Sequence, residues 1–168
     1  MILHLSSCQF YGTMPSSIGS LSELVYLDLS YNNFNGVVGL EFIKDLKNLK
    51  WLYISNSGFS LNIGSFSSSF PKISTLILVG CKLTKIPTFI KHQDQMFNLN
   101  LSNKITHEIP PFICNIIGLT TLDLSNNKLT DTVPPCLLED GIDLLVLNLG
   151  GNRLHGAVPH GISPKCEL

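Results

Sequence analysis

The chain has 168 residues, of which 44% are hydrophobic and 14% are charged, and its formal net charge is -1 at pH 7. This near-neutral balance gives no electrostatic reason to expect binding of nucleic acid or of an anionic membrane. No apolar run approaches the roughly 18 residues that a membrane helix requires, so the sequence predicts no membrane helix and no direct membrane contact within this segment.

A leucine motif recurs along the chain at a regular interval. The pattern Leu-x-Leu, with isoleucine as its second member in the third copy, has its first leucine at Leu3, Leu27, Leu52, Leu76, Leu99, Leu122 and Leu147. Successive copies lie 24, 25, 24, 23, 23 and 25 residues apart, and a period of this size is typical of solenoid repeats. The sequence therefore predicts one array over residues 1–168, with about seven repeats that begin near residues 1, 24, 49, 73, 96, 119 and 144.

Residues 24–36 show the repeat unit most clearly. Alternation around Leu27 and Leu29 indicates a short strand with its leucines on one face, and the asparagine and glycine residues that follow favour a turn. Several units then carry a proline, which suits an irregular or short-helical back. Five residues after the first leucine, most units have a small or amide side chain that can bond free backbone groups. These residues are Cys8, Asn32, Ser57, Cys81, Asn127 and Asn152, and the fifth unit, where the position is slipped, has Lys104.

Two units carry a resemblance to a known family. Residues 119–130 and 144–156 match Leu-x-x-Leu-x-Leu-Ser-x-Asn-x-Leu-x-Gly-x-Ile-Pro, the hallmark of plant extracellular leucine-rich repeats. The chain resembles the ectodomain of plant receptor-like proteins, the kinase-lacking class that includes disease-resistance receptors. The resemblance implies a curved α/β solenoid with a parallel β-sheet on its concave face. It also implies a non-catalytic module that binds a protein, peptide or wall-derived ligand in defence or developmental signalling, with a co-receptor kinase as partner of the full-length protein.

The resemblance also implies a location on the extracellular side of the plasma membrane, as part of a full-length single-pass receptor. Met1 stands directly in front of a repeat, without a signal peptide or a polar cap, and the last residues read like the opening of another repeat. We therefore expect an uncapped fragment of a longer ectodomain. Three alternatives stay open: the ectodomain of a leucine-rich repeat receptor kinase, a secreted inhibitor of microbial wall-degrading enzymes, and a non-functional truncated copy.

Aromatic side chains gather at strand positions that should face solvent on the concave side. Aromatic residues of this kind are enriched in interface hot spots, because they offer a large contact area at low entropy cost. The alternative is that tyrosine and tryptophan simply favour strands. The predicted ligand-binding residues are Tyr26, Asp28, Tyr31, Trp51, Tyr53 and Ile77.

One asparagine is a candidate for glycosylation. Asn100-Leu101-Ser102 is the only N-x-S/T sequon in the chain, and such a sequon is an acceptor for an N-linked glycan. By strand phase Asn100 faces the concave surface, so a glycan there would block one strand of it. The alternative is an unmodified strand asparagine.

Five cysteines are an odd number for a secreted chain. Cys8 and Cys81 occupy the amide position of the repeat and are expected to be buried free thiols. Cys114 and Cys136 follow proline pairs in adjacent repeats, so they are a candidate disulfide on the back of the array if the compartment is oxidising. The alternative for this pair is two independent small hydrophobic residues. Cys166 is left without a partner.

No residue pattern indicates catalysis. The five histidines are scattered over different repeats without the paired spacing that holds zinc. Phosphate-binding glycine loops, Cys-x-x-Cys pairs and kinase signature motifs are absent from the sequence as well. The sequence therefore predicts no catalytic residue, no metal, no cofactor and no enzymatic activity.

Overall fold

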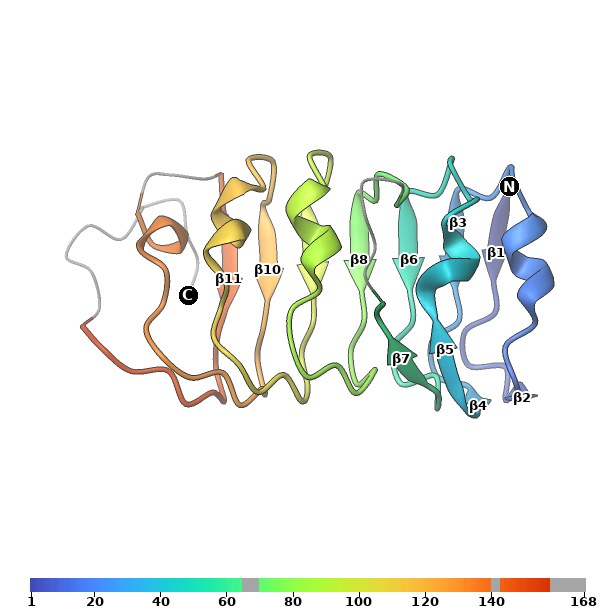
Figure 1. Cartoon of the computed structure of the whole chain (residues 1–168), viewed down its shortest axis with the longest axis horizontal. Coiled ribbons are helices and arrows are strands. Elements are labelled where there is room, and N and C mark those ends of the chain that lie inside the picture. The colour runs from blue at the N-terminus through green and yellow to red at the C-terminus, as the bar shows by residue number, and fades with distance from the viewer. Residues whose placement is uncertain (65–69, 140–142, 158–168) are drawn as a thin grey trace.

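A parallel seven-stranded sheet runs the length of the molecule (Figure 1). The computed structural model describes residues 1–64, 70–139 and 143–157. Within them each repeat contributes one three-residue strand, and strands that follow one another along the array are neighbours in the sheet. The strands are β1 (Ile2–His4), β3 (Tyr26–Asp28), β6 (Trp51–Tyr53), β8 (Thr75–Ile77), β9 (Asn98–Asn100), β10 (Thr121–Asp123) and β11 (Val146–Asn148).

The sheet register stacks the leucines of successive repeats. Leu3 pairs with Leu27, and Leu27 pairs with Leu52. The same register continues through the later strands. The leucines of the inner strands are almost fully buried, whereas Leu3 and Leu5 in the first repeat are half-buried. The core is therefore a column of aliphatic side chains behind the sheet.

Short helices and two small sheets follow the strands in several turns of the solenoid. In the described residues four of the five helices follow a proline, which is extended in three of these four cases, and all five helices are of the 3₁₀ type. They are η1 (Ser16–Ser20), η2 (Leu40–Ile43), η3 (Thr88–His92), η4 (Pro111–Asn115) and η5 (Pro135–Leu137). The small sheets pair β2 (Tyr11–Gly12) with β4 (Asn33–Phe34), and β5 (Val37–Gly39) with β7 (Ser60–Asn62).

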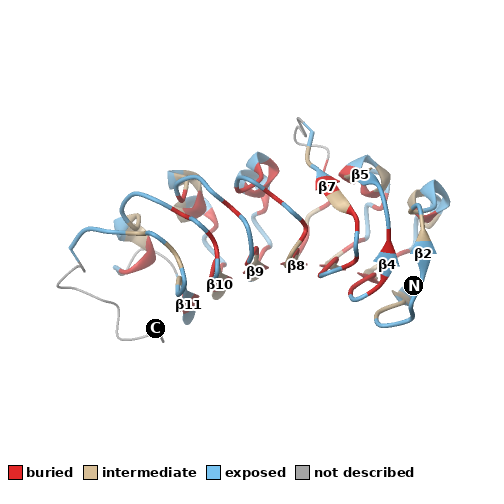
Figure 2. Cartoon of the chain, turned by 90° about the horizontal axis from the view of Figure 1, so that it is seen from below, coloured by how far each residue is buried: buried red, intermediate tan, exposed pale blue. Residues whose placement is uncertain are grey.

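Figure 2 shows the array as an arch with the strands of the large sheet on its inner side and the helices on its outer side. The predicted fold, a curved repeat array with a concave parallel sheet, is confirmed. Its helical component consists of 3₁₀-helices in the described residues, because each helical segment has only three to five residues and such short segments favour this geometry.

Asparagines at the amide position tie each repeat to the preceding one. The Asn127 carboxamide donates to the carbonyl oxygens of Leu124 (2.8 Å) and Leu101 (3.1 Å) and accepts from the backbone N–H of Ile105 (2.8 Å). Asn32 and Asn152 make equivalent sets of bonds. We call this row of side chains the amide ladder.

Three non-asparagine residues of the amide ladder behave differently. The thiol of Cys81 is buried and donates to the carbonyl oxygen of Ile54 (2.6 Å), so it replaces one amide bond. The buried hydroxyl of Ser57 is too short and makes no hydrogen bond. The prediction that Cys8 is buried is wrong, because its side chain is exposed. Its thiol donates to the carbonyl oxygen of Ser6 in the same repeat (3.3 Å), whereas Asn32 reaches the carbonyl oxygen of Leu5 in the neighbouring repeat.

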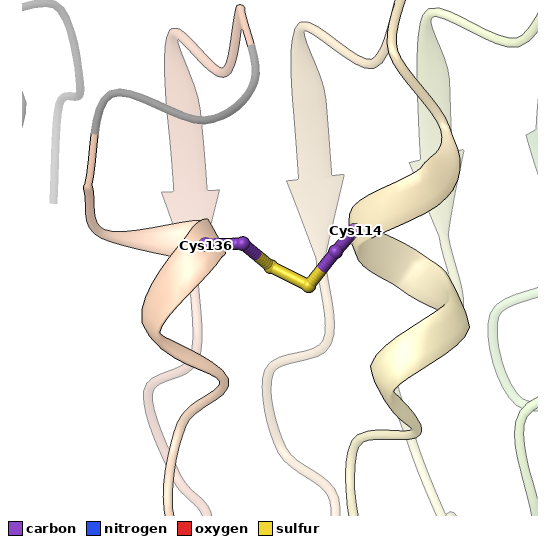
Figure 3. The surroundings of a disulfide bond; sticks show 2 residues. All are labelled: Cys114 and Cys136. Atoms are coloured by element: carbon purple, nitrogen blue, oxygen red, sulfur yellow. A yellow bond between two sulfur atoms is a disulfide. The ribbon is translucent and has the colours of Figure 1, made fainter.

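A disulfide joins the outer sides of two adjacent repeats (Figure 3). Cys114 lies in η4 and Cys136 in η5, and their Cα atoms are 5.8 Å apart. The bond therefore links η4 and η5 directly, on the side of the array opposite to the large sheet (Figure 2). Cys166 lies outside the described residues.

Replacing Asn127 by alanine should destabilise the array. The substitution leaves the buried N–H of Ile105 and the carbonyl oxygen of Leu101 without this partner, whereas Leu124 keeps its bond from Asn152. We expect a loss of about 3 kcal/mol. Asn126→Gly is the matched control, because Asn126 adopts a left-handed φ of 55° that suits glycine. The midpoint of urea unfolding, followed by circular dichroism, measures both variants. A loss for Asn127→Ala no larger than that of the control would contradict the structural role of the ladder.

Removing the disulfide should also destabilise the molecule. The bond closes a loop between positions 22 residues apart, for which the chain-entropy model gives about 3 kcal/mol. Changing both Cys114 and Cys136 to serine should lower the urea midpoint accordingly. A reductant should lower the midpoint of the unmodified chain by a similar amount and leave that of the double variant unchanged. A reductant effect on both proteins would show that another thiol is responsible.

Candidate functional site

Two rows of side chains project from the concave face of the large sheet. They occupy the strand positions on either side of the first leucine of each motif, and the sheet register aligns them across the strands. The first row contains Ile2, Tyr26, Trp51, Thr75, Asn98, Thr121 and Val146. The second row contains His4, Asp28, Tyr53, Ile77, Asn100, Asp123 and Asn148.

Three of the predicted aromatic residues form one cluster on β3 and β6. Tyr26 lies opposite Trp51 in the register, and its ring packs 5.3 Å from that of Tyr53, measured between centroids. All three side chains are half-buried. They line an open, mainly apolar hollow of about 480 Å³ whose other walls are Met1, Ile2 and Val25. We call Tyr26, Trp51 and Tyr53 the aromatic cluster.

Asp28 lies on β3 opposite Tyr53 in the register and is only 8% exposed. Its Oδ1 accepts a hydrogen bond from the backbone N–H of Ser30 (2.9 Å), and its Oδ2 lies 3.3 Å from Nε2 of His4. The sequence predicted that this carboxylate faces solvent, whereas in the structure both of its oxygens have neighbours within the protein. A direct contact between Asp28 and a ligand stays a prediction.

Burial and the Asp28 carboxylate change the acidity of the two clustered phenols. Loss of solvent around Tyr26 raises its pKa above the ordinary value, and the negative charge of Asp28 raises it further. Burial and then the same carboxylate also raise the pKa of Tyr53. Both side chains are therefore neutral hydrogen-bonding groups throughout the physiological range, and they present an uncharged surface to a ligand.

Of the two remaining predicted binding residues, Ile77 lies beside the cluster and Tyr31 lies apart from it. Ile77 is half-buried on β8, directly opposite Tyr53 in the register. Tyr31 lies beyond the strand in the turn after β3, where it is 60% exposed and has a left-handed φ of 54°. The structure therefore places five of the six residues on the three adjacent strands β3, β6 and β8 and leaves Tyr31 at the edge. Their role in binding stays a prediction.

A recurring function of the second row was missed from the sequence. Four of its residues accept a hydrogen bond from the backbone N–H two positions later, at distances of 2.9 to 3.2 Å, and so cap the end of their strand. They are Asp28, Asn100, Asp123 and Asn148. The recurrence of aspartate or asparagine between the paired leucines was the available signal, because these side chains bond nearby backbone groups.

The sequon asparagine takes part in this capping. Oδ1 of Asn100 accepts from the N–H of Ser102 (3.0 Å), and its Nδ2 donates to Oδ2 of Asp123 (3.0 Å). The side chain is half-buried. A glycan on Nδ2 would disturb the bond to Asp123 and cover β9. Glycosylation of Asn100 stays a prediction.

The described part of the chain contains neither a metal-binding group nor a membrane-spanning helix. Residues 1–64, 70–139 and 143–157 contain no group of three histidine, cysteine or acidic side chains arranged to hold a metal ion. No helix in these ranges is long and apolar enough to cross a membrane. The concave face is therefore the surface whose geometry points to a function.

Comparisons with known proteins agree with this architecture. The Leucine Rich Repeat family model matches residues 1–21, 23–45 and 118–139. Receptor-like protein 35 of Arabidopsis thaliana is 35% identical over 160 residues, which cover 95% of this chain and 15% of that relative. Among solved structures, a TDR receptor aligns with a TM-score of 0.74 and 26% identity, over 95% of this chain and 28% of that one. The complex PEPR1-AtPEP1 aligns with a TM-score of 0.70 and 27% identity, over 90% and 25% of the two chains.

The molecule is a leucine-rich repeat array of the plant extracellular type. More narrowly, the chain belongs to the leucine-rich repeat family of plant receptor-like proteins. It spans only 15% to 21% of the length of the curated relatives that it matches. The predicted absence of enzymatic activity agrees with this membership, since the matched proteins are receptors and receptor-like proteins.

Replacing Tyr26 and Tyr53 together by phenylalanine should reduce the loss of stability at high pH. The unfolded chain releases these phenolic protons near the ordinary pKa of 10.0, whereas the folded chain releases them at higher pH. Their contribution to stability is therefore full below about pH 10 and is lost as the pH rises above it. Urea midpoints from neutral to strongly alkaline pH measure the effect. Identical slopes above pH 10 for both proteins would contradict it.

Proposed function

We propose that this segment is part of the ligand-recognition surface of a plant cell-surface receptor-like protein. In the full-length single-pass receptor it lies on the extracellular side of the plasma membrane, and its concave face binds a protein, peptide or wall-derived ligand in defence or developmental signalling. A co-receptor kinase is the expected signalling partner of the full-length protein. A receptor kinase would use the same concave surface, so the proposed site does not depend on which of the two classes carries it.

The aromatic cluster carries this proposal. Tyr26, Trp51 and Tyr53 are held at adjacent strand positions and line one hollow of the concave face. Partly buried aromatic side chains lose little entropy on binding, because their rings already have fixed positions. A surface of this kind suits recognition of an apolar group by shape and contact area.

Two further observations support the proposal. Among solved structures, the array is similar to a TDR receptor and to PEPR1-AtPEP1. The disulfide between Cys114 and Cys136 fits an extracellular setting, because such bonds form and persist in oxidising compartments.

A binding assay on the purified chain tests the proposal with two defined sets of probes. One set is a phage-displayed library of random dodecapeptides, and the other is a mixture of pectic, cellulosic and chitin oligosaccharides. Members of at least one set should bind, and Trp51→Ala or Tyr53→Ala should weaken that binding about tenfold or more. Tyr11→Ala is the matched control, because Tyr11 is 86% exposed on β2, outside the concave sheet. The intrinsic fluorescence of Trp51, the only tryptophan, reports binding directly.

Two outcomes would contradict this proposal. Binding that is equally weakened by Tyr11→Ala would place recognition outside the concave face. No binding from either set, in a preparation that unfolds cooperatively, would favour the truncated, non-functional copy.

A further inference from the structure

We infer that the preferred ligand of the concave face is an extended peptide in which an apolar side chain and a basic side chain lie four or five residues apart. The apolar side chain occupies the hollow over the aromatic cluster, and the basic side chain pairs with Asp123 on β10. This inference rests on the proposed function and names the ligand class of the same surface.

The shape and lining of the hollow select an apolar side chain. Its walls come from Tyr26, Trp51 and Tyr53 together with three aliphatic neighbours, and its volume is about 480 Å³. Asp28 is not among the residues that line the hollow, and its side chain is largely buried. A ligand group in the hollow therefore meets ring and aliphatic carbon atoms, and burying apolar surface there stabilises the complex.

The arrangement of the rings favours a peptide over a sugar. The planes of Tyr26 and Tyr53, which both line the hollow, are inclined by 36°. The rings thus enclose a hollow rather than form one flat platform on which the face of a sugar ring could stack.

The charges of the two rows indicate a basic ligand group. Neither row contains a lysine or an arginine, and the only acidic residues in them are Asp28 and Asp123, both in the second row. Oδ2 of Asp28 lies 3.3 Å from Nε2 of His4. Asp123 is half-buried and accepts one hydrogen bond on each oxygen, from Ser125 and Asn100. Because an ionised carboxylate has about four acceptor sites, Asp123 can still accept bonds from an ammonium or guanidinium group.

The sheet geometry fixes the spacing between the two ligand groups. β6 and β10 are separated by β8 and β9 in the strand order, so three strand spacings of about 4.8 Å give about 14 Å. An extended peptide advances about 3.3 Å per residue, and roughly four or five residues therefore span the distance. Such a peptide crosses the strands and runs along the inside of the arch.

Asn98 lies on this path and can bind the peptide backbone. It occupies the first row of β9, between Thr75 and Thr121 in the register. Its carboxamide is half-buried and makes no hydrogen bond to the residues that the structure describes. It therefore offers both a donor and an acceptor, whereas the carboxamide of Asn100 is already bonded on both sides.

Selection from the random dodecapeptide library tests the inference, with the Trp51→Ala chain used to remove peptides that bind elsewhere. Selected peptides should be enriched in an aromatic or aliphatic residue and a lysine or arginine at a separation of four or five. Asp123→Asn should weaken their binding about tenfold and reduce its dependence on salt. This variant keeps the amide oxygen that caps the strand, as Asn100 and Asn148 do on either side.

Synthetic peptides provide the matched controls for the charge. Replacing the selected basic residue by norleucine should reproduce the effect of Asp123→Asn in the unmodified chain. It should have little further effect in the variant, because the charged pair is then already lost. Moving the basic residue by two positions should weaken binding to a similar degree.

The outcomes separate this inference from the proposed function. Peptides that need Trp51 but show no basic residue, or that ignore Asp123→Asn, would overturn the inference and leave the recognition surface in place. Oligosaccharides that bind through Trp51 while peptides do not would also overturn it. Loss of all Trp51-dependent binding would overturn both proposals.

The sequon provides an independent check of the path along β9. In a chain secreted by plant cells, a glycan on Asn100 would lie across the proposed peptide. Ser102→Ala removes the sequon without changing Asn100. If mass spectrometry shows a glycan, this variant should bind the selected peptide more tightly than the glycosylated chain. Equal affinity of the two forms would contradict a path across β9.

Discussion

The register of the large sheet is the constraint on which the rest of the structure depends. Each strand has only three residues, so a slip of one position would turn its buried leucine toward solvent and expose its neighbours' core. The fifth repeat shows how the register survives a change in length, because Leu101 and Ile105 are one residue closer in sequence than the equivalent Leu29 and Phe34 of the second repeat. Its shortened turn contains two successive left-handed residues, Asn103 at φ 80° and Lys104 at φ 92°. The missing residue is absorbed in the turn, and Leu99 keeps its pairing with Leu76 and Leu122.

Polar side chains then divide between two structural tasks. The amide ladder satisfies backbone groups inside the turn, while the second row caps the strands on the concave face. Tyr53 interrupts this second row, and the N–H of Ser55 is bonded instead by the hydroxyl of Ser30 from the neighbouring repeat (3.1 Å). The aromatic residue therefore stands at a capping position without leaving a buried donor unpaired. This compensation lets an interaction surface replace a structural residue at little cost in stability.

The leucine period was sufficient to predict the sheet, its register and the face that each strand residue occupies. It could not predict how far a side chain on that face is covered. Asp28 is only 8% exposed and has the N–H of Ser30 and the ring of His4 as neighbours, and such contacts depend on side-chain conformation rather than on period. Cys8 has the same place in its repeat as Asn32, yet it is exposed because burial depends on the adjacent repeat. Tyr31 has a turn geometry that moves it away from the cluster.

The separation of core and surface explains how recognition can change while the array is preserved. In a solenoid each repeat contacts only its neighbours, so a substitution on β3 or β6 is felt mainly by the strands beside it. The leucines that form the column point away from the two concave rows, and the helices and the disulfide lie on the opposite side of the arch. Side chains of the rows can therefore vary without altering the register. The aromatic cluster uses this freedom, because its rings are fixed by one another and by Asp28 rather than by the core.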